Sequence, residues 1–509
     1  MTADSNASAN PPVDAEAEAI ARRDSYKLRA GRLGALAIAF FVISAAAPLT
    51  GMAGGAPFAM LLGNGSGVPT SYLLVTLLML VFAVGYVAMS RHHTSSGAFY
   101  AYIAKSMGGK AGGAAAFVAL LGYNAMQIGL YGLFGVATAG FIQATFNITI
   151  AWWIIAFVAM GVIGILGYRQ VDLSLKVLAV LVACEFLIVI IFDVLVLIRG
   201  GGGGGQSLNM SSFTWDAFAQ GSPAIGLLFA AASFVGFEAT TIYSEEAKEP
   251  RRTVPRATYI AVLTIGIFFM ITTWLMVNAY GQDNLVEFIG GEELGGPTNF
   301  LFAIAEPYIG SFLTNTVMLF LFASSLFAAL LAFHNAVARY GYSLGREGLV
   351  PEHLGRTHPI HLSPHIASLS QTVLAFVIVG FFAVRGLSPD GQLFTWLTQL
   401  GTLAITYLMA FAAAAVLVFF MRNKGLDSNP WRTFIAPVLG AVGLLVLAIY
   451  ATSQFSFLVN LPGSPLAWIL PGLIPVFALV GVIAAILLQN RQPEAYAQMG
   501  RNRLEPPVH

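Results

Sequence analysis

The sequence predicts an all-α integral membrane protein with twelve transmembrane helices, and three observations support this prediction. First, 57% of its 509 residues are hydrophobic and only 10% are charged, whereas a soluble domain carries about 25% charged residues. Second, apolar stretches recur at about the 20 residues that a helix needs to cross a bilayer. Third, lysines and arginines fall almost entirely on one side of the resulting topology, as expected of a multi-pass membrane protein.

The candidate spans are separated by segments rich in turn-forming residues. They lie near residues 33–63, 69–89, 111–144, 150–167, 171–198, 222–247, 254–280, 309–338, 365–385, 391–421, 433–453 and 466–488. With both tails on one side, 23 of the 25 lysines and arginines share that side, and only Arg199 and Arg385 lie on the other. Because cytoplasmic loops are enriched in these residues, we expect both termini in the cytoplasm, the protein in the cell membrane, and the acidic 281–306 loop outside.

Composition also excludes several classes of function. The single cysteine, Cys184, rules out a disulfide framework, and no clustered histidines with carboxylates indicate a metal site. A net charge of +1 argues against a nucleic-acid partner. Phosphate-binding loops, nucleophile elbows and zinc helices are missing from the sequence, so we expect no enzyme activity and no cofactor. Residues 1–30 predict a disordered cytoplasmic tail without a signal peptide, and residues 489–509 predict a second cytoplasmic tail.

Two spans contain residues that interrupt a helix. In span one, Pro48 is followed by Gly51, Gly54 and Gly55, and in span six Gly236 precedes Glu238 at membrane depth. Proline removes a backbone hydrogen bond, and glycine relaxes the adjacent turn. Proline kinks and close glycine packing are also common in ordinary membrane helices, which leaves a purely structural interpretation open.

The spacing of the two interruptions favours a transporter. They lie five spans apart, and an odd repeat length inverts the second copy, which predicts inverted repeats of spans 1–5 and 6–10. Corresponding broken helices in such repeats indicate a substrate site, where freed N–H groups bind anions and freed carbonyls bind cations. We therefore expect a first repeat at 31–198, a glycine-rich extracellular loop at 199–221, a second repeat at 222–422 and two further spans at 423–488. A zwitterion such as an amino acid suits this pair of dipoles.

Three stretches resemble amino acid permeases of the amino acid–polyamine–organocation (APC) superfamily. Residues 236–257 (GFEATTIYSEEAKEPRRTVPRA) resemble the family's span-six signature. Residues 96–102 (SGAFYAY) resemble the start of its span three, and residues 334–351 resemble the end of its span eight. The resemblance covers roughly residues 30–490. It implies a LeuT-like fold of a 5+5 inverted repeat plus two helices, discontinuous helices one and six, and alternating access.

The resemblance and the interruptions together predict the substrate-binding residues. These are Pro48, Thr50, Gly51, Met52, Gly54, Gln127, Ser233, Phe234, Gly236, Phe237 and Glu238. Here Thr50-Gly51-Met52 replaces the small-Ser-Gly turn usual in the family. Gln127 aligns with a family substrate contact, or bonds across helices instead. The two phenylalanines cover the substrate in relatives, although plain packing explains them almost as well.

For coupling, the candidate residues are Glu185, Glu238, Ser324 and Ser325. Carboxyl groups inside a membrane are expensive and are functional by default. Many relatives carry a lysine in span five, at about Val182 here, and Glu185 lies one turn further. We therefore favour a proton carried by Glu185, with Glu238 second. Alternatively these acids are structural, or Ser324 and Ser325 complete a sodium site with span-one carbonyls.

These patterns predict a secondary transporter of amino acids, driven by a proton or by exchange. A polyamine or alkylamine transporter of the same fold is the near alternative, and a membrane substrate sensor is a more distant one. The partners expected are therefore a small-molecule substrate, a proton or sodium ion, and membrane lipid, with the chain as a monomer or homodimer.

Overall fold

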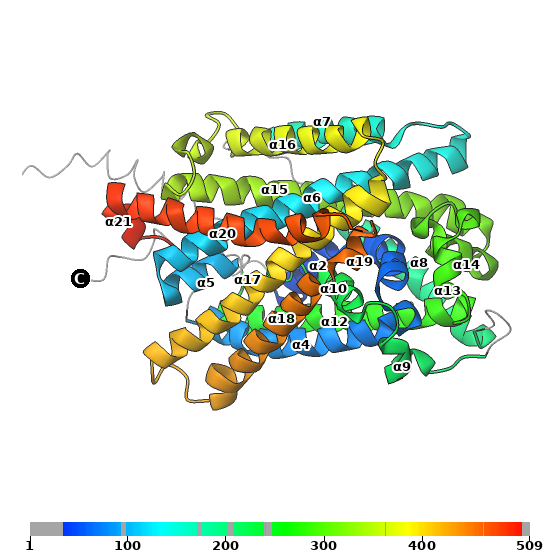
Figure 1. The fold of residues 1–509 in the computed structure, drawn as a ribbon, viewed down its shortest axis with the longest axis horizontal. Helices are drawn as coiled ribbons and strands as arrows, with labels where there is room; N and C mark the ends of the chain where they lie inside the picture. The colour runs from blue at the N-terminus through cyan, green and yellow to red at the C-terminus, as the bar shows by residue number, and fades with distance from the viewer. Residues whose placement is uncertain are drawn as a thin grey trace, which may run out of the picture.

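The computed structural model describes residues 34–92, 98–169, 175–201, 207–238, 240, 247–361, 363–461 and 463–500. Within these residues the chain is almost entirely helical, and its β-structure is an isolated bridge between Gly201 and Ser207. Helices run roughly along the long axis of the molecule (Figure 1). The predicted N-terminal tail (1–30), the glycines at 202–205 and parts of the motifs at 96–102 and 236–257 lie outside the described residues.

Nine helices of the described residues are long and apolar enough to cross a membrane. Two shorter apolar helices, α7 and α10, lie where spans four and six are predicted. Since the first helical run, Thr50–Ser90, joins parts of spans one and two, these elements are compatible with the predicted twelve spans. The apolar sequence therefore folds into the all-α membrane protein expected from its composition.

The spans are built as follows. Span one contains α2 (Ala35–Ala45), η1 (Thr50–Gly55), α3 (Ala56–Phe58) and η2 (Ala59–Asn64); spans two to five contain α4 (Val68–Ser90), α6 (Gly109–Phe146), α7 (Trp152–Tyr168) and α8 (Leu175–Arg199). Spans six to eight contain α10 (Pro223–Ala232), α12 (Pro250–Tyr280), and η9 (Leu313–Met318) with α15 (Leu319–Glu347). The remaining spans contain α16 (His365–Val384), η11 (Pro389–Phe394) with α17 (Thr395–Arg422), η12 (Trp431–Ile435) with α18 (Ala436–Ser453), and α20 (Leu466–Arg491).

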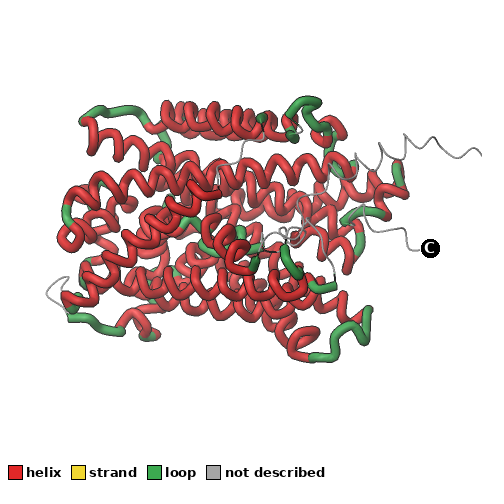
Figure 2. Tube along the Cα trace, turned by 180° about the vertical axis from the view of Figure 1, so that it is seen from behind, coloured by secondary structure: helices red, strands yellow, loops and turns green. Residues whose placement is uncertain are grey.

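Helix α6 occupies the interior and packs against α15, α17 and α20, whereas α7 and α16 lie side by side along one edge (Figures 1 and 2). Close backbone approach explains part of this packing. A methyl group added at Gly113 of α6 would lie 2.4 Å from the carbonyl oxygen of Gly481 in α20. Small residues permit such contact between membrane helices. The edge helix α16 exposes Val373, Phe376 and Phe381, as expected of a surface that meets lipid.

Short helices fill the segment between spans seven and eight, which the sequence analysis treated as a loop. They are α13 (Leu285–Gly290), η7 (Glu292–Leu294), η8 (Pro297–Asn299) and α14 (Phe300–Ile309). Both η8 and α14 contact η1 of the first span, and α14 also contacts α8. Apolar residues of this segment, including Leu285, Ile289, Phe300 and Leu301, are buried beneath its acidic surface. The segment is therefore a packed cover over one end of the bundle.

At the opposite end, a C-terminal segment packs onto the bundle. It comprises α21 (Pro493–Ala497) and the residues up to Gly500. The backbone N–H of Gly500 donates to the hydroxyl of Tyr100 at 3.0 Å, in α5 (Ala98–Met107). Met499 is buried. This described part of the predicted tail is thus docked against the helices.

The distribution of basic residues predicts that Ser207 faces the outside of the cell. Ser207 is exposed, and it follows α8. In a Cys184→Ala background, we expect a membrane-impermeant thiol reagent to label Ser207→Cys in intact cells. Protection in intact cells, with labelling in inside-out vesicles, would reverse the orientation. The Cys184→Ala parent supplies the unlabelled control.

Candidate functional site

The first helix breaks at Ala47. The N–H of Ala46 makes the last bond of α2, to the carbonyl of Val42 at 3.1 Å, and Ala47 then adopts a left-handed φ of 44°. Pro48 follows and has no N–H to donate. The N–H of Gly51 bonds to the carbonyl of Ala47 at 3.0 Å, so a new helical turn begins directly after the break. Leu49 is consequently the first residue of this turn with a free backbone donor.

That donor meets a carboxylate from span five. The Leu49 N–H lies 3.4 Å from Oε2 of Glu185, a residue that is 1% exposed. The hydroxyl of Ser325 in span eight donates to the same oxygen at 2.8 Å. The hydroxyl of Thr50 in turn donates to the Ser325 oxygen at 3.2 Å. Glu185 thereby joins the break in span one to spans five and eight.

This arrangement ties the charge of Glu185 to the contact between three helices. An anionic carboxyl is stabilised by the positive N-terminal end of a half-helix and by charge-assisted hydrogen bonds. A proton on Glu185 removes that charge and weakens the attraction to the Leu49 N–H and the Ser325 hydroxyl. Both bonds end on Oε2, so a change of charge at Glu185 acts on the groups that hold the broken helix. Binding and release of a proton there would therefore act directly on the broken helix.

The second break lies in span six. Helix α10 ends at Ala232, and Gly236 has a φ of 101°, a conformation that favours glycine. The N–H of Gly236 donates to Oε2 of Glu238 at 2.9 Å, and the hydroxyl of Tyr123 in span three donates to Oε1. Ser233 hydrogen-bonds the hydroxyl of Tyr72 in span two, at 3.3 Å. Glu238, 2% exposed, thus holds the unwound turn and links it to span three.

The two phenylalanines at this break are buried. Phe237 packs its ring against Phe82, Tyr86 and Phe99, with centroid distances of 5.8, 5.7 and 6.0 Å. Phe234 is 1% exposed. In this conformation Phe237 therefore contributes to an aromatic cluster between spans two and six and helix α5.

Packing at the first break depends on two of the predicted glycines. A methyl group at Gly51 would lie 2.2 Å from Cε1 of Phe269 in span seven, and one at Gly54 would lie 2.5 Å from Cδ2 of Leu133 in span three. Met52, between them, is fully buried. The first broken helix is therefore in close contact with both neighbouring spans.

Gln127 lies in a different polar cluster. Its Nε2 is 3.2 Å from Nδ1 of His334, and its Oε1 accepts a hydrogen bond from Gln371. The Nε2 of His334 is 2.7 Å from the hydroxyl of Ser368. In this conformation Gln127 connects spans three, eight and nine. This corresponds to the alternative in which Gln127 bonds across helices instead of contacting the substrate. Ser324 likewise bonds the carbonyl of Leu321 within its own helix, at 2.9 Å, while its neighbour Ser325 reaches Glu185.

The sequence did not reveal three groups that hydrogen-bond residues at the breaks. They are the Leu49 N–H, which meets Glu185, the Tyr72 hydroxyl, which meets Ser233, and the Tyr123 hydroxyl, which meets Glu238. Tyr123 had a usable signal, because it lies four residues before Gln127 on a helix predicted to face the core. Glu185 bonds Leu49 and Ser325, and all of these contacts, like that of Tyr123 with Glu238, join residues more than a hundred positions apart along the chain. Helical periodicity carries no information on such pairs. Within the described part of the chain, no group of three or more His, Cys, Asp or Glu side chains is placed to hold a metal ion.

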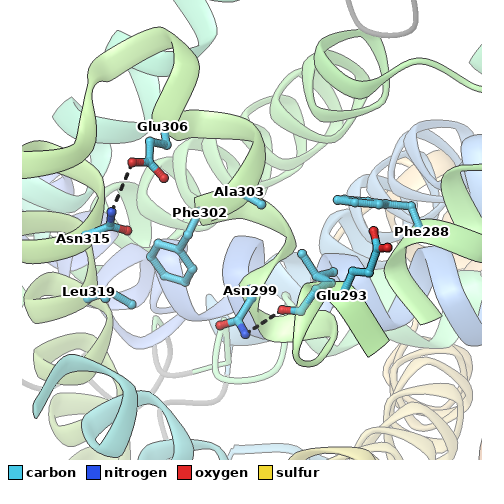
Figure 3. Close-up of a pocket in the computed structure, with 9 residues that line it drawn as sticks. Phe288, Glu293, Asn299, Phe302, Ala303, Glu306, Asn315 and Leu319 are labelled. Carbon is cyan, nitrogen blue, oxygen red and sulfur yellow. Dashed lines mark hydrogen bonds between the residues drawn. The ribbon is translucent and has the colours of Figure 1, made fainter. Parts of the chain in front are cut away.

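A cavity of about 310 Å³ lies in the cover between spans seven and eight (Figure 3). Its lining includes Glu293, Asn299, Phe302, Glu306 and Asn315, and the amide of Asn315 donates to Glu306 at 3.4 Å. None of the substrate-site or coupling residues predicted from the sequence line this cavity. This cavity is therefore separate from the residues at the two breaks.

Comparison with known proteins agrees with this architecture. The model of the family described as "Amino acid permease" matches residues 33–483. The low-affinity putrescine importer PlaP of Escherichia coli (strain K12) is 25% identical over 402 residues, which cover 77% of this chain and 82% of the importer. The branched-chain amino acid permease BcaP of Bacillus subtilis (strain 168) is 23% identical over 403 residues, covering 75% and 79%.

A solved structure supports the fold independently. The Eremococcus coleocola manganese transporter, in complex with an aromatic bis-isothiourea compound, superposes with a TM-score of 0.53 at 13% sequence identity. The match covers 91% of this chain and 95% of the transporter. Apolar spans, paired helix breaks and a family match over most of the sequence lead to one conclusion: the chain belongs to the amino acid permease family of the APC superfamily and is a secondary membrane transporter.

Proposed function

We propose that the protein moves amino acids across the cell membrane by alternating access, and that a proton on Glu185 drives the transport. The contact that supports this coupling most directly is the pair of hydrogen bonds from Leu49 and Ser325 to the Glu185 carboxyl. Span one carries the predicted substrate residues Thr50, Gly51 and Met52. A change of charge at Glu185 would therefore alter the helix that holds the substrate.

Physical chemistry favours a zwitterionic substrate. Freed N–H groups at the start of a half-helix attract a carboxylate, and an acidic side chain near the second break attracts an ammonium group. Glu238 supplies such a group beside Gly236. In this proposal, Gly51 and the surrounding turn bind the carboxylate end and Glu238 acts on the amine end or on the inner gate.

A polyamine or alkylamine is the second candidate substrate. Two observations favour it: Glu185 already occupies the Leu49 N–H that would otherwise be free for a substrate carboxylate, and the putrescine importer is among the relatives. An amine needs no anion-binding group, and Glu238 supplies a carboxylate for one ammonium group. The two candidates differ in whether the substrate must carry a carboxylate.

Uptake into proteoliposomes separates these candidates. We expect the purified protein to accumulate labelled leucine or another neutral amino acid when the outside is acidic, and to accumulate much less without a pH gradient. Putrescine and simple alkylamines serve as the matched set without a carboxylate. Accumulation of amines alone would replace the amino acid proposal. A strict sodium requirement at fixed pH would replace the proton, with oxygens of Thr50, Ser325 and Glu185 as the ion's ligands.

A further inference from the structure

A second carboxyl group, Asp193, lies on the same helix as Glu185. Both residues are on the buried side of α8, with side-chain exposures of 7% and 1%. At 1.5 Å per residue, about 12 Å separates them along the helix axis. Asp193 lies nearer the end marked by Arg199, which the charge distribution places outside. One helix face therefore carries an acid at the centre of the membrane and another towards the outer surface.

Asp193 has one satisfied oxygen and one unsatisfied oxygen. The hydroxyl of Thr272 in α12 donates to Oδ2 at 2.7 Å. Oδ1 is buried and has no hydrogen-bond partner among the described residues. Leaving a buried acceptor unpaired is unfavourable, and more so when the group is charged. The surroundings therefore suit a carboxyl group that binds a proton while it is covered and meets water when it is uncovered.

The helices with contacts to α8 carry no cation in the stretches named below, and Arg199 of α8 itself donates to the carbonyl of Pro307. Helix α2 contains no titratable residue, α12 contains none between Tyr259 and Tyr280, and α15 contains none before His334. Helix α14 contributes Glu306, which is exposed, and Tyr308, whose hydroxyl donates to the carbonyl of Gly201 at 2.7 Å. A proton is thus the simplest means of neutralising this side chain.

Helix α14 packs against the part of α8 that carries Asp193. The ring of Phe192, next to Asp193, meets the ring of Tyr308 edge-on with centroids 5.8 Å apart. The guanidinium of Arg199 lies 4.9 Å above the same Tyr308 ring and donates to the carbonyl of Pro307 at 2.7 Å. Because α14 also contacts η1, its displacement would uncover part of the first broken helix together with the surface of α8 beside Asp193.

We propose that Asp193 is the outer proton acceptor of this transporter. When α14 moves away, external hydronium transfers a proton to the Asp193 carboxylate, leaving water and a neutral carboxyl. That carboxyl then releases the proton to water in the opened space, and the water delivers it to the Glu185 carboxylate. Only O–H bonds form and break, and one proton moves inward. This inference rests on the proposed proton coupling through Glu185.

The test compares Asp193→Asn with Thr272→Val in the full-length protein. Labelled leucine or putrescine, whichever the wild type accumulates, is taken up into proteoliposomes under an imposed pH gradient, with the external pH stepped from 5.5 to 7.5. We expect the proton-driven uptake of Asp193→Asn to be at least tenfold below the wild type at external pH 7.5. At pH 5.5 most of the uptake should return, because protons are then abundant enough to reach Glu185 without a carboxylate at position 193. Substrate exchange should stay unchanged in Asp193→Asn. Thr272→Val keeps the acid but removes its hydrogen-bond donor, so it should still accumulate substrate at pH 7.5, with a shift in the external pH needed for half-maximal uptake.

Each other outcome decides against the proposal. Asparagine still offers an oxygen to Thr272, so wild-type behaviour of Asp193→Asn together with damage from Thr272→Val would make Asp193 a structural acceptor. Equal loss of exchange and of proton-driven uptake in Asp193→Asn would show a general need for the acid rather than a role in the proton step. If the wild type itself ignores the pH gradient, the proton coupling of Glu185 fails and this inference fails with it.

Discussion

Glu185→Gln is expected to abolish accumulation driven by a pH gradient while substrate exchange continues. Glutamine has nearly the size of glutamate and keeps an oxygen that accepts from Leu49 and Ser325, but it neither takes up nor releases a proton. The helix contacts therefore persist without the coupling. We expect concentrative uptake in proteoliposomes to fall by at least tenfold, and counterflow of labelled substrate to remain within about twofold of the wild type, in line with loss of a transport step rather than of binding.

Adjacent serines provide the control for this prediction. Ser325 donates to Glu185, whereas Ser324 bonds a carbonyl of its own helix. Ser325→Ala should shift the external pH needed for half-maximal uptake, and Ser324→Ala should leave it unchanged. If Glu185→Gln still accumulates substrate on a proton gradient alone, Glu185 is a structural acid and the coupling lies elsewhere.

Gly51→Ala and Gly236→Ala should each reduce uptake at least tenfold in protein that still reaches the membrane. At Gly51 the new methyl group would lie 2.2 Å from the Phe269 ring, which is buried, so either this ring or the two spans would have to move at the break. At Gly236 the φ of 101° would be imposed on a residue with a side chain, at a cost on the order of 1–2 kcal/mol. Initial rates of uptake, normalised to the amount of protein in the membrane, measure both effects.

Gly55→Ala is the matched control for Gly51→Ala. Gly55 lies one turn further along the same broken helix, and a methyl group there meets nothing within 4 Å. Its φ of −84° is also compatible with alanine. Uptake by Gly55→Ala should match the wild type. Normal transport by both Gly51→Ala and Gly236→Ala would leave the glycines as packing residues only.

The sequence was sufficient to predict the fold class and to locate both breaks, because these depend on local properties. Apolar length predicts spans, and Pro48 and Gly236 impose their effects on the adjacent backbone. The helices between residues 285 and 309 were missed because glutamates and glycines interrupt that stretch, so its apolar residues are spread over four short elements. The composition of such a segment predicts a loop even when the segment folds into short helices that pack against the bundle.

The pairing of side chains could not be predicted from periodicity. Gln127 was assigned to the substrate from the family resemblance, yet in this conformation it bonds Gln371, 244 residues later. Glu185 was selected because it is an acid inside a span, but its contact with Ser325 spans 140 residues. Such contacts depend on which helices become neighbours. That information resides in the packing of the whole chain rather than in any one segment.

The docked C-terminal segment has a consequence for how this protein is made. Gly500 bonds Tyr100 across 400 residues of sequence, so the partner of α5 is synthesised only after all the spans that precede it. Contacts of such large sequence separation form late, because a long loop must close before they contribute. During synthesis the Tyr100 hydroxyl therefore lacks its Gly500 partner, and the Gly109 backbone lacks the Tyr496 ring that lies against it, until the C-terminal segment has been made. Completion of this face of the protein is then the final step of its assembly, after insertion of the helices has ended.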